Sequence, residues 1–356
     1  MVNKPAIASS GFQIQWRLFF ILPLFIGGFH ALPSYAQPAV QDETAREEAA
    51  LFALETPPAL PENISQAADL IVAIANGELT LIDLSSPMPV PESIVETKDI
   101  EYGNVNGRPL LLDLYQPQER SGPLPGIVLI HGGGWSSGQR SDYKYYCVRF
   151  PLMGYVVATV SYRFVNEAVF PACVEDVKCA VRWMRANADK YGINPEAIAA
   201  IGGSAGGHLA MMLGYSAGVA ELEGRGGQGE YSSAVQAVVD LYGPVDMTLE
   251  EFHENKTLLA FFGGKHFNEI PDQYRLASPN THLKKGMPPT LIIHGTDDDT
   301  VPVSQADLLE ARLKELDCPY EYLRLKGYPH TLDIAVEINK YVRWHIYHFL
   351  DKHLKR

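Results

Sequence analysis

Residues 197–208 read Ala-Ile-Ala-Ala-Ile-Gly-Gly-Ser-Ala-Gly-Gly-His and contain the pattern G-x-S-x-G at 202–206. The apolar run before the glycines favours a buried strand, and the segment 209–215 favours a helix. A strand, a sharp turn and a helix in this order form a nucleophile elbow, whose strained turn exposes a serine hydroxyl at the end of a sheet. Gly202 and Gly206 lack a Cβ, so strand and helix can approach closely around Ser204. Taken alone the pattern is weak, because an ordinary strand-to-helix turn has the same composition.

Further apolar runs predict the remainder of a sheet. Buried strands are expected at residues 126–130, 155–161, 235–242, 290–294 and 320–325, and Asn106-Gly107 predicts a hairpin between 100–102 and 110–115. Helices are expected between several of these strands, at 142–153, 173–191 and, after the last strand, 334–354. Buried strands separated by helices predict an α/β fold whose mostly parallel sheet is covered on both faces. Reactive side chains then belong on the loops at the carboxyl ends of the strands.

Composition restricts the classes of partner. The 356 residues include 29 basic and 42 acidic residues, a net charge of −13. This balance argues against nucleic acid or anionic membrane as a partner and favours neutral or non-anionic substrates. The cysteines at 147, 173, 179 and 318 are scattered, and we expect free or partly paired thiols. No His/Asp/Glu spacing typical of metal ligands occurs, so no metal and no cofactor are predicted.

The first 36 residues have the pattern of a secretory signal. Lys4 and Arg17 are its only charges, an apolar core spans 18–29, and Ser34-Tyr35-Ala36 offers small residues for cleavage after Ala36. The core contains a proline and two glycines and is short for a membrane span. We therefore expect export and no stable membrane association after cleavage, with an uncleaved N-terminal anchor as the alternative.

Residues 37–95 are rich in proline, with clusters at 56–61 and 87–91. Such density interrupts regular structure, so this lead-in is expected to be a poorly ordered linker, although a lid or spacer is the functional alternative. The catalytic domain is expected at 96–356. It includes an insertion at 246–285 whose aromatic residues either cap a pocket or form ordinary helix core.

A glycine-rich loop follows the strand at 126–130. It reads His131-Gly132-Gly133-Gly134-Trp135. Successive glycines can turn their amides toward one point, and an enzyme that transfers acyl groups needs such donors for the oxyanion of its tetrahedral intermediate. We predict oxyanion donors at Gly133 and Gly134, together with Ala205, the residue after Ser204. The alternative is a flexible turn.

A serine nucleophile needs a base and an acid that orients the base. The loop after the strand at 290–294 contains Asp297, Asp298 and Asp299, and the residues alone do not choose among the three. His330 lies in the loop after the last strand and is the candidate base.

Four segments carry a resemblance to a known family. They are H-G-G-G-W at 131–135, the stretch 170–185, G-G-S-A-G-G-H at 202–208 and H-G-T-x-D-x-x-V-P at 294–302. In this order they resemble the esterase/lipase family of α/β hydrolases, near bacterial feruloyl and acetyl esterases and the hormone-sensitive-lipase group. The resemblance covers roughly residues 98–354.

The resemblance implies an α/β-hydrolase fold and a triad of Ser204, His330 and Asp298, and it gives Asp176 a structural role. It also implies a serine ester hydrolase that forms an acyl-enzyme, with acetylated or feruloylated carbohydrate among the candidate substrates. The signal pattern of residues 1–36 adds the expectation of export, and the modest length of the insertion at 246–285 favours short-chain or aryl esters. A serine peptidase or amidase of the same fold is one alternative. A hydrolase-fold binding protein is another, but such a protein should lack a triad residue or the oxyanion glycines. The oligomeric state is not predicted.

Overall fold

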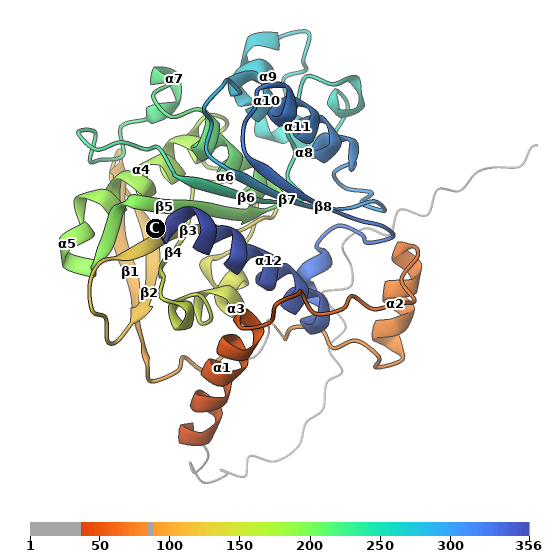
Figure 1. Cartoon of the computed structure of the whole chain (residues 1–356). Helices are drawn as coiled ribbons and strands as arrows, with labels where there is room; N and C mark the ends of the chain where they lie inside the picture. The colour runs from red at the N-terminus through yellow and green to blue at the C-terminus, as the bar shows by residue number, and fades with distance from the viewer. Residues whose placement is uncertain (1–36, 84–87, 356) are drawn as a thin grey trace, which may run out of the picture. The chain divides into compact units, whose positions relative to one another are not determined.

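The strand that leads into Ser204 lies inside an eight-stranded sheet. In the computed structural model, which describes residues 37–83 and 88–355, this strand is β5 (Ile193–Gly203) in the order β1-β2-β4-β3-β5-β6-β7-β8 (Figure 1). The other strands are β1 (Ile94–Val105), β2 (Arg108–Pro117), β3 (Leu124–Ile130), β4 (Val156–Val160), β6 (Ala237–Leu241), β7 (Thr290–Gly295) and β8 (Tyr320–Leu325). β2 pairs antiparallel with β1 and β4, whereas all other neighbours are parallel. The predicted mostly parallel α/β sheet is confirmed.

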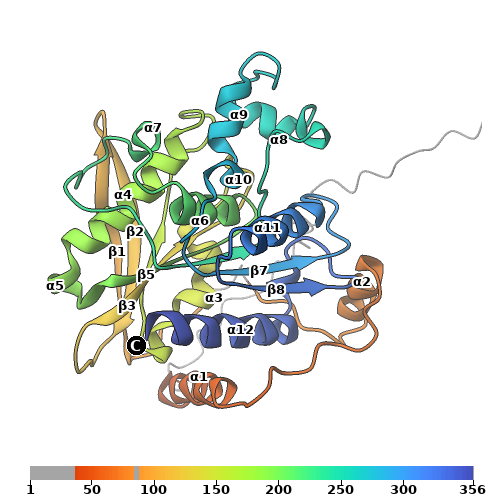
Figure 2. The same cartoon turned by 45° about the horizontal axis from the view of Figure 1, so that its top comes forward.

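Helices cover both faces of the sheet. The α-helices are α1 (Gln37–Phe52), α2 (Ala67–Ala75), α3 (Lys144–Cys147), α4 (Ala172–Ala186), α5 (Ala188–Tyr191), α6 (Ala205–Tyr215), α7 (Ala220–Glu223), α8 (Lys256–Phe261), α9 (Pro271–Ala277), α10 (Pro279–His282), α11 (Ser304–Glu315) and α12 (Val336–Leu354). Short 3₁₀ turns are η2 (Arg140–Tyr143), η3 (Pro151–Met153), η4 (Glu250–Phe252) and η5 (Leu332–Ile334). Figure 2 shows α6 and α11 on one side of the sheet and α12 on the other.

Alternation along the strands builds two hydrophobic cores. On β3, Val128 and Ile130 belong to the core that contains α4, α6 and α11, whereas Ile127 and Leu129 belong to the core with α3 and α12. Successive side chains of a strand point to opposite faces, so a strand buried on both faces is apolar throughout. The continuous apolar runs in the sequence therefore mark the strands.

Local signals decide two further features. The hairpin between β1 and β2 turns at Asn106 and Gly107, which have φ angles of 52° and 87°, as a two-residue hairpin turn requires. The single helix expected at 142–153 is instead divided into η2, α3 and η3. Pro151 begins η3, and a proline cannot continue a helix because it has no amide proton.

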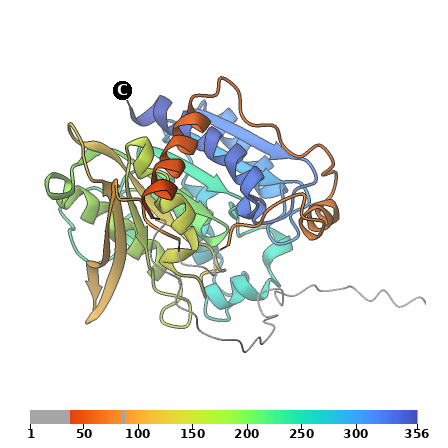
Figure 3. The ribbon, with the colours of Figure 1, turned by 90° about the horizontal axis from the view of Figure 1, so that it is seen from below.

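The lead-in 37–95 is a correction to the sequence-based expectation. Residues from Pro38 onward form one compact unit, and α1, α2 and the start of β1 are ordered within it. Leu51, Leu70 and Leu79 are buried in the core that also contains α12. Figure 3 shows α1, in red-orange, beside the blue helix α12. Proline density was misleading because apolar side chains on both sides of the first proline cluster bury this segment in the core that contains α12.

The structure leaves the predicted signal peptide outside its described residues. Within 37–83 and 88–355, no helix has the length and apolar character needed to cross a bilayer. The four cysteines are buried and free.

Candidate active site

Ser204 lies in a strained turn between β5 and α6. Its φ and ψ are 57° and −123°, a conformation that a side chain disfavours, and its amide donates to the carbonyl of Leu241 at 2.8 Å. A Cβ on Gly202 would lie 2.2 Å from the carbonyl oxygen of Gly206, so strand and helix approach more closely than any other residue allows. The predicted elbow geometry is confirmed.

Three loops at the carboxyl edge of the sheet bring the predicted triad residues together. His330 lies between β8 and α12, and its Nε2 is 2.9 Å from Ser204 Oγ. Its Nδ1 is 2.6 Å from Oδ2 of Asp298, in the loop between β7 and α11. One imidazole therefore bridges a hydroxyl and a carboxylate, as general-base activation of a serine requires.

Burial separates Asp298 from its two neighbours. Asp298 is 7% exposed, whereas Asp297 and Asp299 are exposed. The carboxylate of Asp298 also accepts the amides of Thr300 and Val301 through Oδ1, at 2.9 and 2.8 Å. Asp297 instead accepts the amide of Ala67 at 3.0 Å, in the lead-in.

His294 is a site residue that the sequence analysis missed. It lies one residue before the end of β7 and is fully buried, and its Nε2 lies 2.9 Å from the carbonyl oxygen of Val301 and 3.1 Å from Oδ2 of Asp298. Burial raises the pKa of Asp298, but hydrogen bonds from His294 and His330 outweigh it and hold that pKa below its usual range. The acid therefore stays ionised and accepts the Nδ1 proton of His330.

The glycine loop at 131–135 lies against the elbow, and hydrogen bonds fix the peptide plane between Gly132 and Gly133. A Cβ on Gly132 would be 3.4 Å from the Cβ of Ser204. The carbonyl of Gly132 accepts His131 Nδ1 at 2.9 Å, and the Tyr162 hydroxyl lies 3.1 Å from the carbonyl oxygen of His131 and 3.3 Å from that of Gly132. In a trans peptide the carbonyl and the next amide point in opposite directions, so these bonds also orient the amide of Gly133.

Hydrogen bonds also fix the next peptide plane, between Gly133 and Gly134. The carbonyl of Gly133 accepts the amides of Ser136 and Ser137, both at 3.1 Å, and both serine hydroxyls. These bonds orient the amide of Gly134. Within the described chain, no hydrogen bond uses the amide of Gly133 or Gly134. The amide of Ala205 opens α6, where the first amides of a helix have no intrahelical partner.

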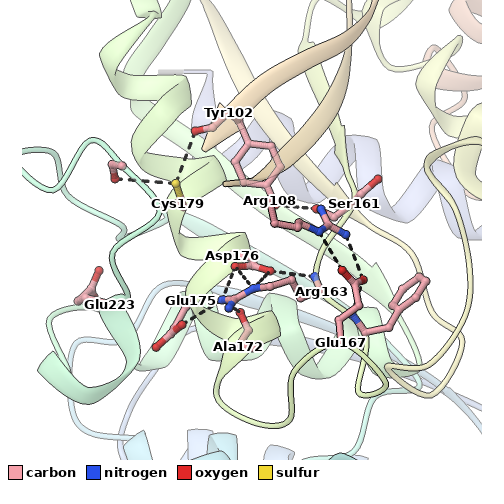
Figure 4. Close-up of polar contacts among 12 residues, drawn as sticks. Tyr102, Arg108, Ser161, Arg163, Glu167, Ala172, Glu175, Asp176, Cys179 and Glu223 are labelled. Carbon is pink, nitrogen blue, oxygen red and sulfur yellow. Dashed lines mark hydrogen bonds and ion pairs between the residues drawn. The ribbon is translucent and has the colours of Figure 1, made fainter. Parts of the chain in front are cut away.

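Asp176 anchors the loop that carries Tyr162. Both carboxylate oxygens accept the guanidinium of Arg163, with Nη2 2.7 Å from Oδ1, and Oδ2 also accepts the amide of Arg163 at 2.8 Å (Figure 4). Because Tyr162 precedes Arg163, this bidentate pair holds the chain that supports the glycine loop. The structural role expected for Asp176 is consistent with this geometry.

The insertion at 246–285 packs its aromatic side chains inward. Phe261, Phe262 and Tyr274 are buried, and Phe261 lies 4.4 Å from the ring of Trp135, measured between centroids. The indole of Trp135 donates to Nδ1 of His208 at 3.2 Å. These aromatic residues form helix core, and the contact with Trp135 places α8 beside the glycine loop.

Among residues 37–83 and 88–355, no group of three or more histidine, cysteine or acidic side chains could hold a metal ion.

A mostly parallel sheet with a Ser-His-Asp array on its carboxyl-edge loops defines an α/β hydrolase of the serine type. The BD-FAE family model matches residues 112–313, more than half of the chain, and the chain belongs to this family. The match includes the glycine loop, Ser204 and Asp298. The lead-in helices and His330 lie outside it.

Curated and solved proteins agree with this assignment. Esterase LipC of Mycobacterium tuberculosis is 33% identical over 218 residues, which are 60% of this chain and 54% of LipC. A truncated carbohydrate esterase from gut microbiota superposes with a TM-score of 0.66 at 26% identity, covering 76% of this chain and 100% of that one. The esterase Est2 of Thermogutta terrifontis, solved with propionate bound, has a TM-score of 0.62 at 26% identity and covers 73% and 93%. The chain spans about half the length of the curated relatives it matches.

Proposed function

We propose that the protein is an exported serine carboxylic-ester hydrolase that acts through an acyl-enzyme on short-chain or aryl esters, including acetylated or feruloylated carbohydrate. The observation that supports this most is the continuous hydrogen-bonded array from Ser204 through His330 to Asp298. Membership of the BD-FAE family supports the same reaction class.

The geometry provides for both half-reactions. Ser204 Oγ attacks the ester carbonyl while His330 Nε2 takes its proton, and Asp298 stabilises the resulting imidazolium. The carbonyl oxygen gains negative charge, which the amides of Gly133, Gly134 and Ala205 stabilise, each donor lowering the barrier by roughly 3 kcal/mol. His330 then protonates the leaving alcohol. Water, activated by the same imidazole, cleaves the acyl-enzyme to acid and free serine.

The neighbours support the proposed substrate class. One solved neighbour is a carbohydrate esterase, and another is an esterase with propionate bound. The insertion here is modest and fills itself with its own aromatic side chains. Short acyl groups therefore suit this site better than long chains.

The test is a substrate panel run beside Ser204→Ala. The panel contains 4-nitrophenyl acetate, butyrate and dodecanoate, methyl ferulate, an acetylated xylo-oligosaccharide and a peptide anilide. We expect turnover of the short, feruloyl and acetyl esters and a loss of about 10³-fold or more in Ser204→Ala. Exposed Ser121→Ala is the matched control. Ester hydrolysis that persists in Ser204→Ala would contradict the proposal, and preferred cleavage of the anilide would favour the peptidase.

Export rests on the charge and apolar pattern of residues 1–36. N-terminal sequencing of the protein from the cell exterior or periplasm should begin at Gln37. A cell-associated protein that retains Met1 would contradict cleavage.

A further inference from the structure

A buried tyrosine touches both the base and the elbow. Tyr242 directly follows β6, and its ring lies edge-on to His330 with centroids 4.8 Å apart. A Cβ on Gly203, the residue before Ser204, would lie 2.9 Å from the Tyr242 hydroxyl. One side chain therefore packs against the imidazole and against the strand that presents the nucleophile.

Tyr242 is held in a strained backbone conformation. Its φ is 48°, which is unfavourable for a bulky side chain, and its amide donates to Ile293 at 2.9 Å. Such a strained conformation persists only where surrounding contacts hold the backbone in it. The tether at the other end of the side chain is a 2.6 Å hydrogen bond from the Tyr242 hydroxyl to Oδ1 of Asp333.

Asp333 is itself fixed from several directions. It is buried in η5, three residues after His330, and its Oδ2 accepts the Tyr146 hydroxyl at 2.7 Å. The carbonyl of Asp333 accepts Asn339 Nδ2 at 2.8 Å, and the same Nδ2 lies 3.0 Å from the Tyr146 hydroxyl. Among the described residues every carboxylate oxygen of Asp333 is therefore paired, so this anchor is rigid.

We propose that Tyr242 is a positioning residue for His330, tethered by Asp333 so that its ring fixes the plane of the imidazole. The inference rests on the proposed function, because it assigns His330 as the base. The hydrogen bond to Asp298 holds only Nδ1, and the ring torsion of a histidine is broad. Contact with the Tyr242 ring restricts the remaining swing and keeps Nε2 within reach of Ser204 Oγ.

Tyr242→Phe tests the tether while keeping the ring. Without its bond to Asp333, the strained residue can relax and the imidazole can rotate. Small misplacements in a catalytic array cost about 10²-fold in rate, so we expect kcat for 4-nitrophenyl acetate to fall roughly 10- to 100-fold with KM within about twofold. Active sites are counted with diethyl 4-nitrophenyl phosphate, so that unfolded protein does not lower the apparent kcat.

Tyr215→Phe is the matched control. The Tyr215 hydroxyl is also buried and pairs with Thr290 Oγ1 at 2.8 Å, at the start of β7 and away from the triad. Tyr215→Phe loses a neutral buried hydrogen bond, whereas Tyr242→Phe loses a stronger one to a carboxylate. We therefore expect a larger fall in melting temperature in Tyr242→Phe and an unchanged kcat in Tyr215→Phe. Equal kcat per titrated site in Tyr242→Phe and the unmodified protein would overturn the inference.

A second readout does not depend on activity. The proton that His330 Nδ1 shares with Asp298 should give a downfield NMR resonance, and we expect it to shift and exchange faster with water in Tyr242→Phe but not in Tyr215→Phe. An unchanged resonance would also overturn the inference. If Tyr242→Phe does not fold, Asp333→Asn, which retains one acceptor, takes its place with the same expected changes. A wild-type protein that hydrolyses no ester refutes the proposed function, whereas the NMR comparison still decides the positioning role.

Discussion

At the scale of single residues, Asp240 in β6 has a buried carboxyl group of which only one oxygen accepts a hydrogen bond. Its Oδ1 accepts the amide of Gly243 at 2.9 Å, while Oδ2 has no partner among the described residues. Burial raises the pKa of Asp240 to about 7, although nearby His294 and the Gly243 amide oppose the increase.

This carboxyl should make stability depend on pH. Between about pH 4 and pH 7 the folded state retains a proton that the unfolded state has released, so the free energy of unfolding falls as pH rises through this window and levels off above it. Asp240→Asn removes the titration and keeps an acceptor for Gly243. Urea unfolding should show that the unmodified protein loses roughly 2.6 kcal/mol relative to the variant between pH 5 and pH 8. Exposed Asp189→Asn controls for the loss of one negative charge. Parallel pH profiles for the unmodified protein and Asp240→Asn would contradict the prediction.

Burial and remote partners explain which site residues the sequence could reveal. Ser204 and His330 stand in local patterns, a glycine-flanked turn and a loop after the last strand. Asp298 could not be distinguished from Asp297 by spacing, since the difference lies in burial and in contacts with His330. Tyr242 has no local pattern, because its partner Asp333 is 91 positions away.

At the scale of elements, the elbow depends on two backbones that touch. A Cβ on Gly202 would lie 2.2 Å from the carbonyl oxygen of Gly206 and 2.9 Å from that of Ile130, and neither backbone atom can move as a side chain can. We expect Gly202→Ala to lower the free energy of unfolding by about 3 kcal/mol or more, measured by thermal and urea unfolding.

Gly122→Ala is the control for this substitution, because nothing lies within 4 Å of the added Cβ. Its stability should stay within about 0.5 kcal/mol of the unmodified protein. Similar stabilities for the two variants would show that β5 and α6 can move apart at the elbow. Their close packing would then not be required for the stability of the fold.

The strands were predictable and the docking of the lead-in was not. A strand buried on both faces is apolar along its length, so the strands at 126–130 and 290–294 can be recognised from their local sequence. The contact of α1 with α12 instead includes Glu48, whose partner Arg343 is 295 positions away on α12. A single acid in an acidic helix carries no local sign of such a partner.

At the scale of the whole molecule, helix α1 lies outside the family match but is tied to the far end of the chain. Glu48 is 1% exposed, and its carboxylate accepts Arg149 Nε and Arg343 Nη2, both at 3.0 Å, and the Tyr347 hydroxyl at 2.5 Å. Arg343 also donates to Asn339, which contacts Tyr146 and so reaches the anchor of Tyr242. The lead-in is therefore part of a continuous hydrogen-bonded network that runs from Glu48 through Arg343 and Asn339 to Tyr146 and Asp333.

Glu48→Gln should destabilise the protein through this network and leave its catalytic rate nearly unchanged. Neutralising the acid leaves two guanidinium groups buried without their counter-charge, which destabilises proteins by about 3 to 5 kcal/mol. Urea unfolding should show this loss in Glu48→Gln and almost none in Glu47→Gln, whose exposed side chain is its neighbour on the same helix. Because Asn339 and Tyr146 still hold Asp333, kcat per titrated active site should remain within about twofold. A large fall in kcat with intact stability would mean that α1 acts on the triad directly, and equal stabilities of the two variants would mean that α1 docks through its apolar side chains alone.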